Sequence, residues 1–196
     1  MKKSFLIFLF VFTTIIAQEP DEKLKSLQKK FETINDLTVD VVQKSGGAEV
    51  LSGKLSYKKN NKFNLDLKNN LIVSDGSSIW NFNKKEKKVI INNVDESDPS
   101  FFSFNTFVYE YPSKCNITSE QNGEVLVLTP QANSDLNFVK AQLWINQDNL
   151  VSKVTLEGTG AGSTEVIFLN YKLNQDITDS QFKFIPPEGS SIIDLR

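Results

Sequence analysis

The chain has 196 residues, of which 22 are basic and 24 are acidic, with no histidine and a single cysteine. This balance offers no basic excess to attract nucleic acid. The absence of histidine excludes Ser-His-Asp and Cys-His catalysis and removes the commonest zinc ligand. An enzyme with two carboxylates acting on envelope glycans is the alternative, but the acidic residues fall mostly at turn positions. We therefore expect no catalytic residues, no metal site and no cofactor.

The N-terminus has the pattern of a secretory signal peptide. Lys2 and Lys3 precede an apolar run from Phe5 to Ile16, and Ala17 precedes a polar stretch. The run is about 12 residues, too short for a membrane-spanning helix, although an uncleaved anchor is the alternative. We expect residues 1–17 to be a signal peptide and residues 18–196 to form a single domain outside the cytoplasm. Because the first segment holds two lysines and no acid, the mature net charge is −4, from 20 basic and 24 acidic residues.

Cys115 is the only cysteine, so no internal disulfide can form. An isolated thiol is most simply a small apolar filler, and we assign Cys115 no other role. No cysteine lies near the expected cleavage point, so the protein itself is not expected to carry a lipid anchor.

An apolar stripe predicts a helix over residues 22–34. It consists of Leu24, Leu27, Phe31 and Ile34, at helical spacing, with lysines on the opposite side. Asn35 and Asp36 then end it.

Period-two alternation predicts strands along most of the remaining chain. Gly46–Gly47 and Asp75–Gly76 are the clearest turn signals between them. The expected strands lie at 39–43, 55–57, 63–67, 71–73, 79–82, 89–91, 124–128, 139–145, 150–157, 164–173 and 182–185.

A second helix is predicted from Asp98 and Pro99, an N-cap and a first-turn proline, to about Tyr109. Pro112 is expected to prevent it from continuing. Its apolar stripe consists of Phe101, Phe104, Val108 and Tyr111.

These elements favour a mainly β domain in which one antiparallel sheet curls over two helices. A curled sheet with a helical cover can keep an apolar cavity. Periodicity alone leaves a filled core equally open.

Lys59 falls on the inward face if the strand through Leu55 and Tyr57 continues regularly. A cation at the rim of an apolar face needs a carbonyl, a carboxylate or a ligand head group. The alternative is that the strand ends at Lys58, with Lys59 in water and Asn60–Asn61 as a turn.

Several segments together resemble the outer-membrane lipoprotein carrier protein (LolA) family. They are GKLSYKKNNKF at 53–63, VSDG at 73–76 followed by Ile79 and Trp80, LTP at 128–130, and FKFIPPEG at 182–189. The resemblance covers essentially the whole mature chain. Each motif is weak alone, and their shared order is the specific feature.

The resemblance implies a half-open antiparallel β-barrel closed by helices, with an apolar cavity between sheet and lid. It implies a non-enzymatic periplasmic carrier that takes triacylated lipoproteins from an ATP-driven inner-membrane transporter to an outer-membrane acceptor. We expect a monomer. The alternative is a lipid-binding or envelope-sensing module of the same fold that does not shuttle.

On this hypothesis apolar side chains from the sheet and from both helices bind the acyl chains, and Lys59 latches the lid. The family carries an Arg-Pro pair where this chain has Lys59–Asn60, and a Trp where it has Leu65. Lysine keeps the charge but lacks the planar fork of five donors, which implies a weaker latch. The expected acyl-binding residues are Phe63, Leu65, Leu67, Leu55 and Tyr57 on the sheet, and Leu24, Leu27, Phe31, Phe101, Phe104 and Val108 on the helices.

Overall fold

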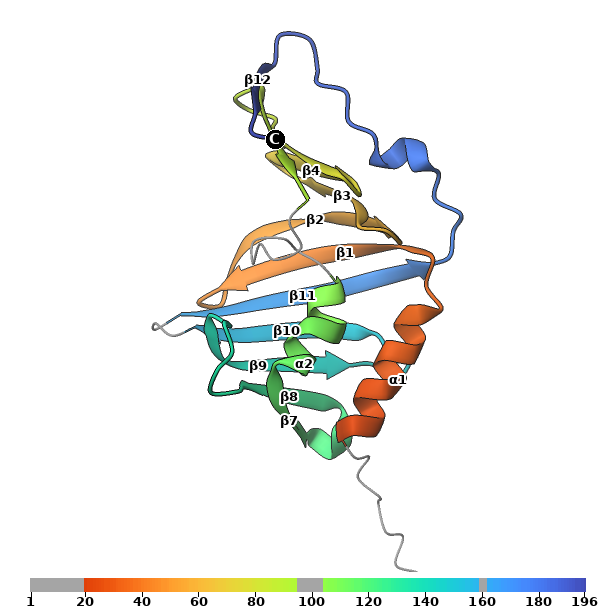
Figure 1. Cartoon of the computed structure of the whole chain (residues 1–196), viewed down its shortest axis with the longest axis vertical. Coiled ribbons are helices and arrows are strands. Elements are labelled where there is room, and N and C mark those ends of the chain that lie inside the picture. Colours follow the sequence, from red (N-terminus) through yellow and green to blue (C-terminus); the bar gives the residue numbers. More distant parts are fainter. Residues whose placement is uncertain (1–19, 95–103, 159–161) are drawn as a thin grey trace, which may run out of the picture.

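The alternating segments assemble into a single long sheet in the computed structural model, which describes residues 20–94, 104–158 and 162–196. Neighbouring strands pair antiparallel, except that β12 runs parallel to β6. The sheet curls without closing into a barrel, and two short helical segments lie against its concave side (Figure 1). The expected fold class is therefore confirmed.

The sheet has 12 strands among the described residues, in the order β12-β6-β5-β4-β3-β2-β1-β11-β10-β9-β8-β7. The strands are β1 (Asp36–Ser45), β2 (Ala48–Lys58), β3 (Lys62–Leu67), β4 (Asn70–Asp75), β5 (Ser78–Asn83), β6 (Lys88–Asn93), β7 (Cys115–Glu120), β8 (Val125–Pro130), β9 (Phe138–Ile145), β10 (Val151–Gly158), β11 (Ser163–Leu173) and β12 (Ser191–Asp194). The helical segments are α1 (Pro20–Glu32), η1 (Thr106–Glu110), α2 (Tyr111–Ser113), η2 (Gln121–Gly123) and η3 (Asp179–Phe182).

The first predicted helix is confirmed as α1, which ends two residues earlier than expected. Proline at its start and acidic residues in its first turn suit a helix N-terminus, and Lys29 and Lys30 suit the last turn. The Thr33 hydroxyl donates to the carbonyl of Lys30 at 2.7 Å and closes this end. The expected signal peptide lies outside the described residues.

The second helix does not stop before Pro112 as expected, and continues to Ser113. A wider π turn precedes the proline, in which the Tyr111 N–H donates to the carbonyl of Thr106. Pro112 then stands in the first turn of α2, where a missing N–H is tolerated. The predicted start at Asp98 and Pro99, and Phe101, lie outside the described residues.

The turn predictions are confirmed. Gly46 and Gly47 both adopt positive φ between β1 and β2, as do Asn60 and Asn61 between β2 and β3. The Asp75 carboxylate accepts hydrogen bonds from the N–H groups of Ser77 in the turn and of Ser78 at the start of β5.

The strand expected at 182–185 is wrong, and two strands, β7 and β12, were not predicted. Residues 179–182 form the short helix η3, and Phe182, only 1% exposed, packs on the convex side of β3 and β4. Phe184 then contacts the ring of Phe82 at 5.6 Å. Phe182 and Phe184 thus cover the outside of the sheet, Ile185 is exposed, and this segment does not join the sheet. Figure 1 shows this blue segment passing around β1 to β4 on its way to β12.

Asp179 fastens this covering segment. One carboxylate oxygen accepts a hydrogen bond from the ammonium group of Lys58 at 2.7 Å, and the other accepts one from that of Lys62 at 2.9 Å. These hydrogen bonds lower the pKa of Asp179 from its ordinary 3.8 to about 2.

A group whose pKa is lower in the folded state stabilises the fold above its unfolded pKa, and that contribution is lost as the pH falls toward the folded value. We expect Asp179→Asn to lower the melting temperature at neutral pH and to flatten its decline between about pH 4 and pH 2. Thermal melts against pH measure this, with Asp148→Asn as an exposed control that has no ion pair among the described residues. Parallel pH profiles for parent and Asp179→Asn would contradict the assignment.

Candidate functional site

The concave face of the sheet is apolar at the residues predicted from alternation. Phe63, Leu65 and Leu67 on β3 are 6%, 8% and 9% exposed, and the residues between them face the convex side or solvent. Leu55 on β2 is buried beside them, and Tyr57 is half-buried against the same cluster. The structure therefore brings the five sheet residues together.

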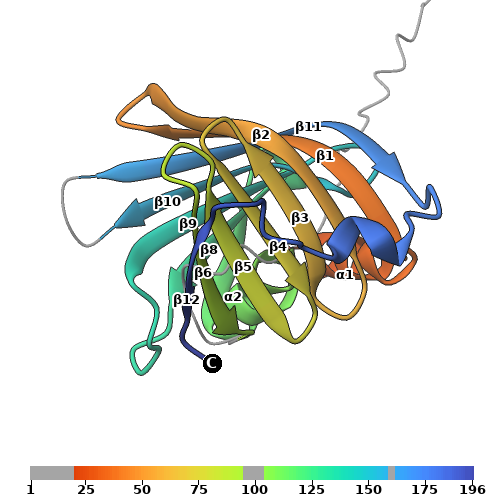
Figure 2. The same cartoon turned by 90° about the horizontal axis from the view of Figure 1, so that it is seen from above.

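The two helical segments cover this face, and we call α1 together with residues 104–113 the helical cover. Figure 2 shows both lying under the arch of the sheet. Leu27, Phe104 and Val108 are buried in the shared core, and Leu24 and Phe31 pack against it. All the cover residues predicted to meet the sheet do so, apart from Phe101, which is not described.

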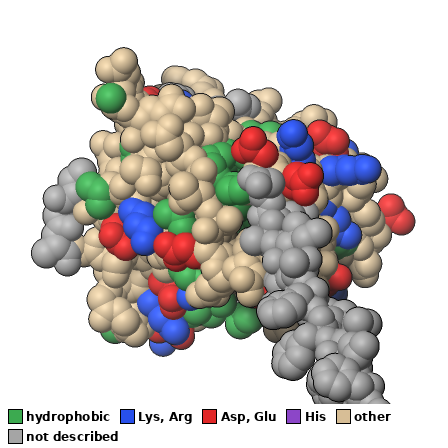
Figure 3. Space-filling view, turned by 90° about the horizontal axis from the view of Figure 1, so that it is seen from below, with side chains coloured by type: hydrophobic (Ala, Val, Ile, Leu, Met, Phe, Trp, Pro, Cys, Tyr) green, Lys and Arg blue, Asp and Glu red, His purple; other side chains and the backbone are tan. Residues whose placement is uncertain are grey.

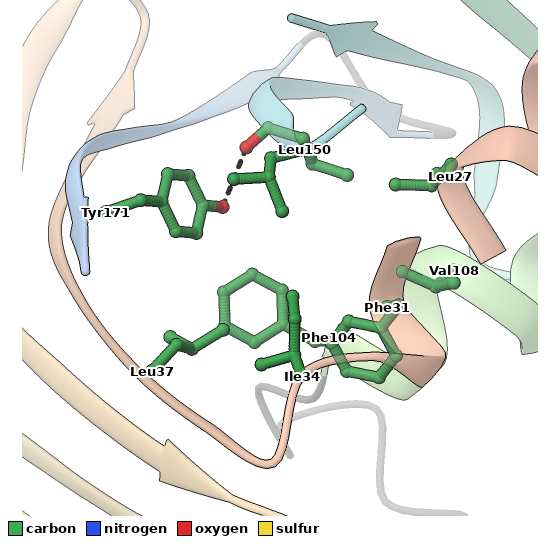
Figure 4. A pocket seen from close by; sticks show the side chains of 9 residues that line it. Leu27, Phe31, Ile34, Leu37, Phe104, Val108, Leu150 and Tyr171 are labelled. Carbon is green, nitrogen blue, oxygen red and sulfur yellow. Dashed lines mark hydrogen bonds between the residues drawn. The ribbon is translucent and has the colours of Figure 1, made fainter. Parts of the chain in front are cut away.

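A small cavity of about 10 Å³ remains between sheet and cover (Figure 4). This is about the smallest space that holds one water molecule, far less than an acyl chain requires. Side chains of the cover thus occupy the interior in this structure. The lining residues are Leu27, Phe31, Ile34, Leu37, Phe104, Val108, Leu150, Val151 and Tyr171.

Phe104 stands at the centre of a cluster of rings that joins cover to sheet. Its centroid lies 6.0 Å from that of Phe31, 6.0 Å from Tyr57 and 5.3 Å from Phe168. Ring pairs in such tilted and edge arrangements are favourable beyond their buried area. The cover is therefore held to the sheet chiefly by apolar contacts of the kind that an acyl chain can replace.

Tyr171 lines the cavity although alternation along β11 assigns it to the outside. The register between β1 and β11 shifts at this point, and Asn170 adopts a φ of 57°. Such a bulge turns the next side chain to the opposite face. The Tyr171 hydroxyl donates to the carbonyl of Val151 at 2.7 Å, and burial raises its pKa. An asparagine inside a strand was the available signal, since asparagine tolerates positive φ.

Gln28 links the two parts of the cover. Pro112 has no N–H to offer the carbonyl of Val108 one turn earlier, and that carbonyl accepts the Gln28 amide at 3.1 Å. The hydroxyl of Tyr109 in turn donates to the carbonyl of Gln28 at 3.4 Å. We did not predict this contact, because residue 28 lies beside the apolar stripe and its partner is a backbone group.

Lys59 lies just past β2, which ends at Lys58, and its side chain turns back to the end of α1. Its ammonium donates to the carbonyl of Glu32 at 3.0 Å and to the side-chain oxygen of Asn35 at 3.3 Å. Neither reading from the sequence described this fully: Lys59 does not point into the apolar interior, and it is exposed yet bonded to the cover. A cation at a helix C-terminus also complements the helix dipole.

Asn174 secures the same end of α1 from the other side. Its amide donates to the carbonyl of Thr33 at 3.1 Å, and its side-chain oxygen accepts the Asn35 N–H at 2.8 Å. At the opposite end, Lys23 donates to Asn149 at 3.3 Å. The helix is thus fastened most firmly where it joins β1.

Replacing Lys59 with methionine should speed amide hydrogen exchange in α1 a few-fold. The substitution removes a helix-terminal charge interaction worth about 0.3–1 kcal/mol and frees one helix carbonyl. Exchange resolved by mass spectrometry measures this, and Lys59→Arg, which keeps the charge, should stay close to the parent. Unchanged exchange in Lys59→Met would show that this contact does not hold the helix.

The described ranges, 20–94, 104–158 and 162–196, contain neither a membrane-spanning helix nor a metal-binding cluster. None of their helices has the length and apolar character needed to cross a membrane. Within the same ranges, no three Cys, Asp or Glu side chains gather as a metal site would require. Figure 3 shows basic and acidic side chains interspersed on one face of the molecule.

The model of the family "Outer membrane lipoprotein carrier protein LolA" matches residues 32–185, which include β1 to β11 and most of the core. The chain belongs to the LolA family. An outer-membrane lipoprotein carrier protein of Actinobacillus pleuropneumoniae serotype 3 is 27% identical over 207 aligned positions, covering 100% of this chain and 95% of the relative. Membership places the chain in a family of lipoprotein carriers, which bind cargo and are not enzymes.

Two further proteins similar to this chain are named only as uncharacterized. An uncharacterized protein of Methanocaldococcus jannaschii is 26% identical over 188 positions. The alignment covers 88% of this chain but only 53% of the relative, so the chain spans about half of that protein's length. A crystal structure of an uncharacterized protein from Thermus thermophilus superposes with a TM-score of 0.58 at 13% identity, covering 89% of this chain and 98% of that one. The latter supports the fold alone.

Proposed function

We propose that this LolA-family chain binds the acyl chains of triacylated lipoproteins between the concave sheet and the helical cover. It then carries them through the periplasm, from an ATP-driven inner-membrane transporter to an outer-membrane acceptor. The observation that supports this most directly is the apolar interior, which is enclosed by a cover held through ring contacts and a few polar bonds. Cleavage of residues 1–17 and a single domain over 18–196 belong to the same proposal.

The energetics favour a closed resting state with a replaceable cover. A 16-carbon acyl chain gains roughly 12 kcal/mol on leaving water, at about 0.8 kcal/mol per methylene. When the helical cover opens, residues such as Phe31 and Phe104 lose their contacts with the sheet. The entering acyl chain then makes apolar contacts of the same kind. Loading and release are then near balance, and a modest shift in the cover sets the direction.

The test is saturable binding of a fluorescent 16-carbon acyl probe to residues 18–196. A second measurement uses donor vesicles that hold a triacylated lipopeptide, from which a carrier should move the lipopeptide into the soluble fraction and on to acceptor vesicles. No probe binding by the folded protein would contradict the acyl site. Binding without transfer would instead favour a lipid-binding module that does not shuttle.

A further inference from the structure

Strand β2 extends beyond its neighbour β3. On one side it pairs with β1 from Ala48 to Lys58, whereas on the other side the pairing with β3 begins only at Gly53, opposite Leu67. Within the described residues, 48–52 therefore have a strand partner on one side alone. Figure 2 shows the β1–β2 hairpin reaching past the end of β3 and β4.

The backbone of Ser52 faces this open side. Antiparallel partners alternate between hydrogen-bonded and non-hydrogen-bonded pairs. The Lys59 N–H donates to the carbonyl of Asn35 at 3.0 Å, so Lys59 and Asn35 form a hydrogen-bonded pair. By the same alternation, the backbone N–H and C=O groups of odd-numbered residues in β2 point toward β1, and those of even-numbered residues point toward the β3 side. The N–H and C=O of Ser52 thus point to where β3 has already ended.

A groove of about 240 Å³ runs along this edge. Val50 is the extra residue of a bulge, because Gln43 pairs with Leu51 and Lys44 with Glu49, and it is 58% exposed. Leu67 and Leu51 also belong to the apolar core or pack against it, so the groove begins at the rim of the interior. Its lining consists of Val50, Leu51, Ser52, Leu67, Lys68, Asn69 and Asn70.

We propose that this edge binds the extended polypeptide segment that follows the acylated residue of a bound lipoprotein, which adds to β2 as a further strand. The inference rests on the proposed function, since it gives the peptide part of the same cargo a place beside the acyl chains. Only an extended backbone offers the alternating donors and acceptors that an open strand edge requires. An apolar side chain of the segment fills the groove over Val50. An acidic one faces Lys68, which is exposed and has no ion pair among the described residues.

The experiment compares two ligands on three proteins. The ligands are triacylated cysteine alone and triacylated cysteine followed by a peptide of about ten residues with one aspartate. The three proteins are the parent and two variants, Ser52→Pro and Ser52→Ala. Ser52→Pro removes the outward N–H but leaves the pairing with β1 intact, and Ser52→Ala keeps that N–H. Competition against the acyl probe gives each Kd.

In the parent and in Ser52→Ala, we expect the peptide to tighten binding about tenfold, as one or two added hydrogen bonds and a filled groove would do. In Ser52→Pro this gain should disappear, while triacylated cysteine alone binds all three proteins equally. That equality also shows that the proline variant is folded.

Three outcomes would overturn the inference. Equal Kd values for the two ligands in the parent would do so while leaving the acyl site in place, as would a peptide gain that survives in Ser52→Pro. A dimer seen by sedimentation in the parent and lost in Ser52→Pro would assign the edge to a second copy of this chain. Failure of triacylated cysteine to bind the parent at all would instead contradict the proposed function.

Discussion

Replacing Phe104 with alanine should lower the free energy of unfolding by about 3–5 kcal/mol and still tighten acyl-probe binding by about tenfold or more. Phe104 is 3% exposed and its ring contacts Phe31, Tyr57 and Phe168. Its removal leaves a cavity where the acyl chain is proposed to lie. The contacts that the Phe104 ring loses when the helical cover opens are then already absent. The acyl chain therefore binds a site that is already partly open. Denaturant unfolding and probe titration measure the two effects.

Phe182→Ala is the matched control. Phe182 is equally buried, at 1% exposure, but it packs on the convex side of β3 and β4, away from the helical cover. We expect a similar loss of stability and an unchanged Kd for the probe. If both variants tightened binding alike, general loosening of the fold would explain the result, and the position of Phe104 would not.

The parts of the fold that could be predicted were those in which a local pattern decides the structure. In β3, the alternation from Lys62 to Leu67 sets both the strand and the face that is buried. The stripe of α1 and the turns at Gly46–Gly47 and Asn60–Asn61 follow from spacing and from tolerance of positive φ. These patterns sufficed for the curled sheet and for most of the expected lining.

The errors arose where distant contacts override the local pattern. The apolar run at 182–185 has the composition of a strand, but the available apolar surface lies on the outside of the sheet, where Phe184 meets Phe82. Pro112 was read as a helix stop, whereas the preceding π turn places it in a first turn that tolerates proline. The short strand β12 depends on pairing with β6, which lies about a hundred residues earlier in the chain.

The candidate site shows the same division. The spacing of apolar residues identified the stripes, but Tyr171 joins the lining through a bulge. Gln28 links the two parts of the cover through a carbonyl that Pro112 leaves free. The attachment of Lys59 to α1 depends on how β2 and the helix end beside each other, and the spacing of residues within one strand carries no such information.

Replacing Phe63 with glutamate should weaken acyl-probe binding by about a hundredfold or more. Phe63 is 6% exposed on the concave face, so a carboxylate there would lie against the acyl chain, and an uncompensated buried ion costs several kcal/mol. Phe63→Leu keeps an apolar side chain and should bind within severalfold of the parent. Lys54→Glu places a carboxylate on the same sheet at an exposed position of β2 and should bind normally.

The pH dependence of the Phe63→Glu variant separates loss of the site from loss of the fold. A glutamate in apolar surroundings has a raised pKa, so lowering the pH from 7 to about 5 protonates it and removes the charge from the lining. Probe binding should then recover in large part, while Phe63→Leu and the parent change little over the same range. A variant that had simply unfolded would gain nothing from protonation of one side chain. Binding by Phe63→Glu equal to that of the parent at neutral pH would place the acyl chain somewhere other than the concave face.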